Sequence, residues 1–199
     1  MTRTTHTLRR RPALAGAAAA ALLMLSLGAS AQSTGTTGST GGQATTPAAT
    51  PTLDRADRRF MEKAATDGMA EVQIAEMAQQ RAANPKVREF ANRIVQDHGA
   101  ANAELMRLAT AKGMAVPADA GRENKREADR LAKLNGADFD RAYMKHMVEE
   151  HQEDLRDFER ASKAARDSEV KAFATRTLPT LQSHLQLARS TEEALKDSR

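Results

Sequence analysis

The sequence lacks several residue types on which protein sites and folds depend. It has no cysteine and no tryptophan, and among 199 residues it has one tyrosine and five phenylalanines. Without cysteine no disulfide can form, so the stability of the domain must come from packing. The scarcity of aromatic rings also removes the stacking surface that single-stranded nucleic-acid binding uses.

No apolar run is long enough for an ordinary membrane span. The longest, residues 13–28, is shorter than the roughly 20 apolar residues that a transmembrane helix needs. It follows a basic start with four arginines and precedes the small-residue sequence Ala29-Ser30-Ala31. This three-part pattern predicts a secretory signal peptide over residues 1–31, and an uncleaved anchor is the less favoured alternative. No cysteine follows the predicted cleavage point, so we expect no lipid anchor there.

An excess of basic charge is also missing from the predicted mature chain. The whole chain has 30 Lys and Arg against 26 Asp and Glu, and four of the arginines lie in the predicted signal. The remainder therefore balances, and nucleic-acid binding has no electrostatic basis. We expect no nucleic-acid partner.

The composition changes sharply near residue 53. Residues 32–52 are rich in Gly, Ser, Thr and Pro and contain almost nothing that can be buried. They predict a flexible tether, either a spacer from an envelope surface or simply a disordered N-terminus. From Asp54 onward Ala, Leu, Met, Glu, Lys and Arg dominate, which predicts a helical domain over residues 53–197.

The apolar periodicity predicts four long helices, over about 54–81, 84–112, 137–166 and 167–195. Asn84 and Pro85 supply a cap and a first-turn proline for the second helix, Gly113 ends it, and Asp167 or Ser168 caps the fourth. A short, strongly charged helix is expected over 122–134, either as a solvated face or as a docking surface. The fold class is therefore all-α: an up-down-up-down four-helix bundle with an extra short helix in the connection between the second and third long helices.

A repeated motif marks two of these helices. The pattern V-x-x-F-A-x-R occurs at Val87–Arg93 and returns 83 positions later at Val170–Arg176. In both helices the apolar row continues to a histidine, His98 in one and His184 in the other. The two imidazoles are predicted to point into the bundle.

Each of the four apolar stripes is interrupted once by a group that can bind a metal. With the turns near residues 84 and 167 at the same end, the rise of about 1.5 Å per residue places these groups at one level. We predict that they form one metal site: Glu71, His98, His151 and His184. Such donors suit iron, zinc or copper. Carboxylates close in sequence are expected as their partners or as extra ligands: Asp97, Glu104, Glu150 and Asp154. The alternative is a buried hydrogen-bond network that only fixes helix packing.

Over about residues 56–195 the chain resembles the exported bacterial family called domain of unknown function 4142, which is assigned to the ferritin-like superfamily. The matching residues are Glu71 in Met-Ala-Glu-Val, Val87-x-x-Phe90-Ala91, Asp97-His98, Gly136-Ala-Asp-Phe139-Asp140-x-x-Tyr143, His151, and Leu178-Pro179-x-Leu181-x-x-His184. The resemblance implies a ferritin-like four-helix bundle that is periplasmic or associated with the outer membrane, and it implies no established activity.

The sequence departs from the di-iron pattern of ferritin-like proteins. That pattern places a glutamate three residues before a histidine on two helices. The residues three positions before His98, His151 and His184 are instead Val95, Val148 and Leu181. A di-iron ferroxidase centre is therefore not expected, and a mononuclear site or no metal fits better.

Two functions remain in view. One is an exported bundle that binds one transition-metal ion, in metal handling or oxidative stress. The other is a structural or stress-related envelope protein with an unidentified protein partner. An enzyme is the least favoured class, because no recognisable base or nucleophile arrangement is present.

Overall fold

The computed structural model describes residues 53–196. The predicted signal peptide (1–31) and tether (32–52) lie outside the described residues. The described part contains five helices and no strand: α1 (Arg55–Arg81), α2 (Pro85–Ala111), α3 (Gly121–Leu131), α4 (Gly136–Ala164) and α5 (Ser168–Lys196). The all-α fold class, with a short helix between the second and third long ones, is confirmed. Within 53–196, no helix has the length and apolar character needed to cross a membrane.

The predicted helix boundaries have recognisable local causes. The Asn84 side chain accepts a hydrogen bond from the backbone N–H of Lys86, and Pro85 begins α2. At the start of α5, Asp167 Oδ1 accepts hydrogen bonds from the backbone N–H groups of Glu169 (2.9 Å) and Val170 (3.1 Å). Asp167, rather than Ser168, is therefore the cap.

The direction of the third long helix differs from the prediction. The Asp140 carboxylate, near the start of α4, accepts hydrogen bonds from the backbone N–H groups of Ala83 (3.1 Å) and Asn84 (2.8 Å). The start of α4 thus lies against the α1–α2 turn. An up-down-up-down bundle would place it at the opposite end, so this part of the prediction is wrong.

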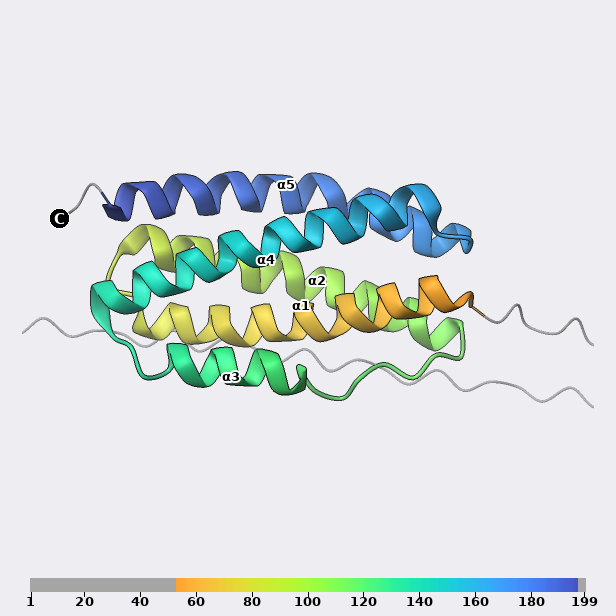
Figure 1. The fold of residues 1–199 in the computed structure, drawn as a ribbon, viewed down its shortest axis with the longest axis horizontal. Coiled ribbons are helices and arrows are strands. Elements are labelled where there is room, and N and C mark those ends of the chain that lie inside the picture. The colour runs from red at the N-terminus through yellow and green to blue at the C-terminus, as the bar shows by residue number, and fades with distance from the viewer. Residues whose placement is uncertain (1–52, 197–199) are drawn as a thin grey trace, which may run out of the picture. The chain divides into compact units, whose positions relative to one another are not determined.

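Contacts at the other end of the bundle agree with this correction. Asp57, near the start of α1, accepts hydrogen bonds from the backbone N–H groups of Arg166 (3.0 Å) and Asp167 (2.8 Å) in the α4–α5 turn. Lys112, at the end of α2, pairs with Asp167 at 2.8 Å. Figure 1 shows the result: α1 and α5 run in one direction, and α2 and α4 run in the other.

The connection between α2 and α4 explains the reversal. Residues 112–135, including α3, run back along the outside of the bundle to the end where α2 began (Figure 1). A 27-residue helix such as α2 is about 40 Å long, so the connection must span that length. A single long crossover of this kind is the connectivity of ferritin-like folds.

The predicted common level nevertheless survives the reversal. Glu71, His98, His151 and His184 each lie within three residues of the middle of their own helix. A residue at mid-helix keeps its height when the helix direction is inverted. The four side chains therefore remain at one level, although the assumed connectivity was wrong.

Two apolar clusters fill the bundle above and below this level. One lies toward the α1–α2 turn and includes Ile74, Phe90 and Met147. The other lies toward the α4–α5 turn and includes Met61, Leu105 and Phe173. The helices pack mainly as two hairpins, α1 on α2 and α4 on α5. The polar level separates the two clusters and crosses the boundary between the hairpins.

Candidate metal centre

The four polar side chains predicted to share a level meet in the middle of the bundle. Glu71 from α1, His98 from α2, His151 from α4 and His184 from α5 are all buried, and none is more than 6% exposed. The imidazole ring centroids lie 5.2 Å (His98 to His151), 5.2 Å (His98 to His184) and 5.5 Å (His151 to His184) apart. The three histidines form a compact triangle with one ring from each of three helices.

The carboxylate of Glu71 holds His98 from outside the triangle. Its Oε2 lies 2.7 Å from His98 Nδ1. Burial raises the pKa of Glu71, but the nearby His98 and His151 outweigh burial and bring that pKa down to about 2. Two opposing effects act on His98 as well. Burial lowers the pKa of His98, but the charge of Glu71 and its hydrogen bond raise it by more, so the pKa of His98 lies above its usual value. Glu71 is thus an anion that fixes a proton on Nδ1 of His98.

His184 is held in a similar way by Asp97. Asp97 Oδ2 lies 2.8 Å from His184 Nε2, and the carboxylate side chain is 36% exposed. Burial is the main cause of the lowered pKa of His184, with the Asp97 hydrogen bond acting in the opposite direction. The Nε2 of His184 therefore carries the proton, and its Nδ1 faces the triangle.

His151 has a backbone partner instead of a carboxylate. Its Nδ1 donates a hydrogen bond of 2.9 Å to the carbonyl oxygen of Met147, one turn earlier in α4. Burial is the main cause that lowers the pKa of His151 to about 4, so the ring is neutral near pH 7. Its Nε2 is buried and has no hydrogen-bond partner. A buried nitrogen lone pair without a partner is uncommon in a folded protein.

The remaining nitrogens of the triangle converge. His98 Nε2 lies 3.2 Å from His184 Nδ1. Because the other nitrogen of each ring donates to a carboxylate, two neutral rings would set two lone pairs against each other. A proton or a cation between them removes this repulsion. One ligand atom from each of His98, His151 and His184 lies within 4.8 Å of the other two, so the donor set fits one metal ion.

The structure gives Glu71 a different place from the three histidines. Its Oε2 lies behind His98, and its Oε1 is 3.4 Å from His151 Nδ1 but accepts no hydrogen bond. It contacts the nitrogens that face away from the triangle. Its role as a metal ligand stays a prediction, and its position suits a residue that orients two of the rings.

The other predicted carboxylates separate into different environments. Asp97 holds His184, as expected for a partner of a ligand. Glu104 pairs with Arg176 across α2 and α5, and Glu150 lies 3.8 Å from His146. Asp154 is buried, and burial raises its pKa well above the usual range. Of these four carboxylates, Asp97 is thus the one bonded to a histidine of the triangle.

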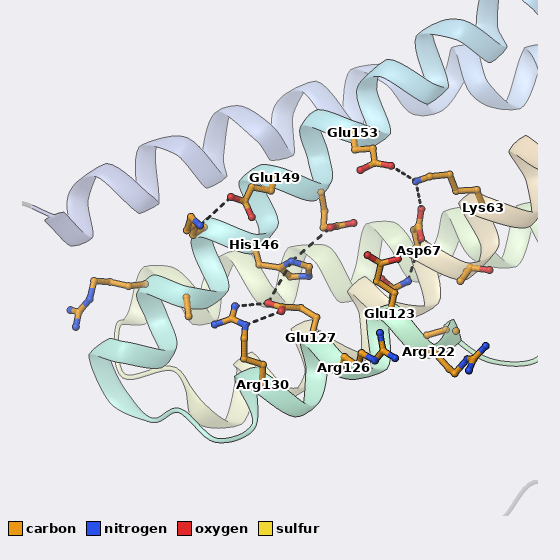
Figure 2. A pocket seen from close by; sticks show the side chains of 18 of the residues that line it. Lys63, Asp67, Arg122, Glu123, Arg126, Glu127, Arg130, His146, Glu149 and Glu153 are labelled. Carbon is orange, nitrogen blue, oxygen red and sulfur yellow. Dashed lines mark hydrogen bonds and ion pairs between the residues drawn. The ribbon is translucent and has the colours of Figure 1, made fainter.

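The predicted charged helix forms one wall of a wide groove between α1, α3 and α4, with a volume of about 1040 Å³ (Figure 2). Most of the charged side chains that line the groove pair with each other. Lys63 lies 2.6 Å from Asp67 and 2.9 Å from Glu153, and Arg130 pairs with Glu127 on α3. This pattern agrees with a solvated helix face.

Arg93 lies near the site and was not predicted to take part in it. Its Nε lies 3.4 Å from Asp97 Oδ2, and its Nη2 lies 3.4 Å from Ser183 Oγ on α5. It is the arginine of the first V-x-x-F-A-x-R motif, and Arg176, its counterpart in the second, pairs with Glu104 on α2. Both arginines thus join α2 and α5. The repeated motif was the signal in the sequence that could have indicated this shared role.

Fold and site together define an all-α bundle with one long crossover and a buried histidine triangle at mid-height. The family described as Domain of unknown function (DUF4142) matches residues 42–191, and the chain belongs to that family. No curated protein matches the chain.

Solved structures with the same fold have low sequence identity to the chain. A DUF305 fragment from Deinococcus radiodurans is 17% identical, with a TM-score of 0.63 over 74% of this chain and 99% of that one. A secreted DUF305 protein from Streptomyces coelicolor, described as putative, is 15% identical, with a TM-score of 0.62 over 71% and 92%. CopM in the Cu(II)-bound form is 19% identical, with a TM-score of 0.59 over 69% and 96%. At these identities the likeness concerns the fold.

Proposed function

We propose that this protein is an exported metal-handling protein that binds one transition-metal ion through His98, His151 and His184. The observation that carries the proposal is the orientation of the three rings. Each has one nitrogen bonded to an acceptor outside the triangle and the other nitrogen directed at its neighbours or left without a partner. Histidines that bind metals are held in this way, because the outer hydrogen bond fixes the tautomer.

The donor set narrows the metal to iron, zinc or copper. Neutral imidazole nitrogens suit these ions better than calcium or magnesium, which prefer oxygen. Three protein nitrogens also leave a coordination position for an exogenous ligand. CopM, which shares this fold, has been solved in a Cu(II)-bound form, and this supports testing copper first.

Export and a role in metal handling or oxidative stress complete the proposal. Its support is the signal-peptide pattern of residues 1–31, together with the secreted Streptomyces coelicolor protein that shares the fold. We place the protein in the periplasm or at the outer membrane. No feature of the site calls for an enzymatic reaction.

The deciding experiment is elemental analysis of the exported chain, purified without a histidine tag. After incubation with Cu²⁺, Zn²⁺ or Fe²⁺ and removal of free ions, we expect about one equivalent of one metal. The double variant His98→Ala with His184→Ala should lose it. His146→Ala is the matched control, because His146 lies outside the triangle beside Glu127 and Glu150. Less than about a tenth of an equivalent in the wild type, or equal uptake in the double variant, would overturn the proposal.

A structural role for the polar level is the second candidate. It is favoured by the continuous chain of contacts from Glu71 through His98 and His184 to Asp97, which a single shared proton would complete. In that case the level only fixes helix packing in an envelope protein that acts through a partner. Apolar replacements of all three histidines would then preserve both fold and phenotype, whereas a folded variant that loses its phenotype would exclude this candidate.

A further inference from the structure

The three histidines are too deeply buried to meet an ion directly from solvent. His151 and His184 are fully buried and His98 is nearly so. Any ion that binds them must cross the packed surface of the bundle. An entry point therefore requires a side chain that contacts both the triangle and solvent.

Asp97 meets both conditions. Its Oδ2 lies 2.8 Å from His184 Nε2, and 36% of its side chain is exposed. It also lines a small cavity of about 30 Å³ whose other walls include Glu71 and His98 on the inside and Thr177 and Thr180 from α5. A cavity of this size admits a water molecule or a single ion. The carboxylate thus lies at the seam between α2 and α5, exposed to solvent on one side and bonded to His184 on the other.

Arg93 covers this carboxylate. Its guanidinium lies 3.4 Å from Asp97 and 3.4 Å from Ser183 on α5, so the side chain bridges the seam. Half of the Arg93 side chain is exposed. An exposed ion pair of this kind contributes little stability and breaks readily. As a cation it also repels an approaching metal ion and competes for Asp97.

We propose that Asp97 is the entry point for the metal ion and that Arg93 gates it. The proposal rests on the proposed metal site and adds its route of loading. An incoming ion takes the place of Arg93 beside Asp97 and then passes to the histidine nitrogens. Asp97 afterwards accepts the hydrogen bond of His184 again. Arg93 slows both loading and release.

The repeated motif supplies a matched control at the same seam. Arg176, the counterpart of Arg93, pairs with Glu104 on α2, and within residues 53–196 neither residue pairs with a histidine. Glu104→Gln and Arg176→Gln therefore remove the same kinds of charge at the same seam between α2 and α5. Only the pair at Asp97 and Arg93 leads to the site.

The test is stopped-flow measurement of Cu²⁺ binding to, and release from, the metal-free exported chain. Asp97→Asn keeps an acceptor for His184 but removes the charge, and we expect association to slow about tenfold. Arg93→Gln should accelerate association and dissociation together by several-fold and leave the Kd nearly unchanged. Glu104→Gln and Arg176→Gln should keep wild-type rates. Circular dichroism establishes that each variant is folded.

Two outcomes would overturn the proposal, and they can be told apart. If Asp97 only positions His184, Asp97→Asn will raise the dissociation rate and leave the association rate at the wild-type value, because most affinity changes lie in dissociation. The entry role then fails while the metal site stands. If equilibrium dialysis shows that the wild type binds no Cu²⁺, Zn²⁺ or Fe²⁺, the proposed function fails and the entry route fails with it.

Discussion

The Nε2 atom of His98 lies 3.2 Å from the Nδ1 atom of His184, while the other nitrogen of each ring is bonded to a carboxylate. Two hydrogen-bond acceptors do not approach this closely unless something positive lies between them. The candidates are a proton and a metal ion. Because His98 belongs to the α1–α2 hairpin and His184 to the α4–α5 hairpin, whatever occupies this position also joins the two hairpins.

Metal binding is therefore expected to stabilise the bundle by joining its two hairpins. An ion that binds only the folded state, at a concentration a hundred times its Kd, adds about 2.7 kcal/mol to the free energy of unfolding. For a domain of this size that corresponds to a rise in Tm of roughly 5–10 °C. Thermal unfolding with and without Cu²⁺ or Zn²⁺ checks this. His146→Ala should keep the full rise and His151→Ala should lose it, and an equal rise in both would indicate binding elsewhere.

Metal affinity should increase as the pH rises through the range in which His98 loses its second proton. The pKa of His98 lies above its ordinary value of 6.5 because Glu71 outweighs burial, so a proton competes with the ion near neutral pH. The pKa of His151 is about 4, so that ring competes only in more acidic solution. Binding at pH 7 should accordingly release a proton, measurable with an indicator dye in weakly buffered solution.

Glu71→Gln tests the cause of this pH dependence. Without the carboxylate, burial dominates and lowers the pKa of His98, so the rise in affinity should move to lower pH. Measurement of Kd between pH 5 and 8.5 on both proteins gives the comparison. If the dependence of Kd on pH is unchanged in Glu71→Gln, a group other than Glu71 sets this pH dependence.

The level of the site could be predicted from the sequence because it depends on local information. The stripe of each helix, and the place at which a polar residue interrupts it, follow from the 3.6-residue period. Since Glu71, His98, His151 and His184 all lie near mid-helix, the prediction did not depend on which way each helix runs. The chemistry of the individual rings was not predictable, because the Met147 carbonyl and Asp97 select the inward-facing nitrogen only in the folded state.

The direction of α4 could not be predicted for a related reason. It is set by the path of residues 112–135, and a strongly charged segment with a helix of its own gives no sign of whether it crosses an end or returns along the side. One of the contacts that hold α4 in this direction, between Asp140 and the backbone at Ala83 and Asn84, joins residues more than 50 positions apart. Such a contact has no periodicity for a sequence pattern to reveal.

Spin-label distances test this topology directly. The chain contains no cysteine, so labelled cysteines can be introduced one pair at a time. Labels at the exposed positions Ala83 and Asp138 should lie at the same end of the bundle, whereas labels at Ala83 and Arg166 should lie about 40 Å apart, the length of one long helix. An up-down-up-down bundle would give the reverse order of distances.

Asp140→Ala should destabilise the fold more than a surface change on the same helix. The buried carboxylate of Asp140 accepts hydrogen bonds from two backbone N–H groups of the α1–α2 turn, at 3.1 and 2.8 Å. Its removal leaves both donors without their partner, at a cost of about 1–3 kcal/mol. Asp138→Ala is the matched control, because Asp138 is exposed and pairs with Arg141, one turn away on the same helix. Urea unfolding of the two variants provides the measurement. Similar midpoints would mean that Asp140 does not hold α4 to this turn, and the parallel arrangement of α2 and α4 would then depend on the connection through α3 and on the contacts of Asp57 and Lys112 at the other end.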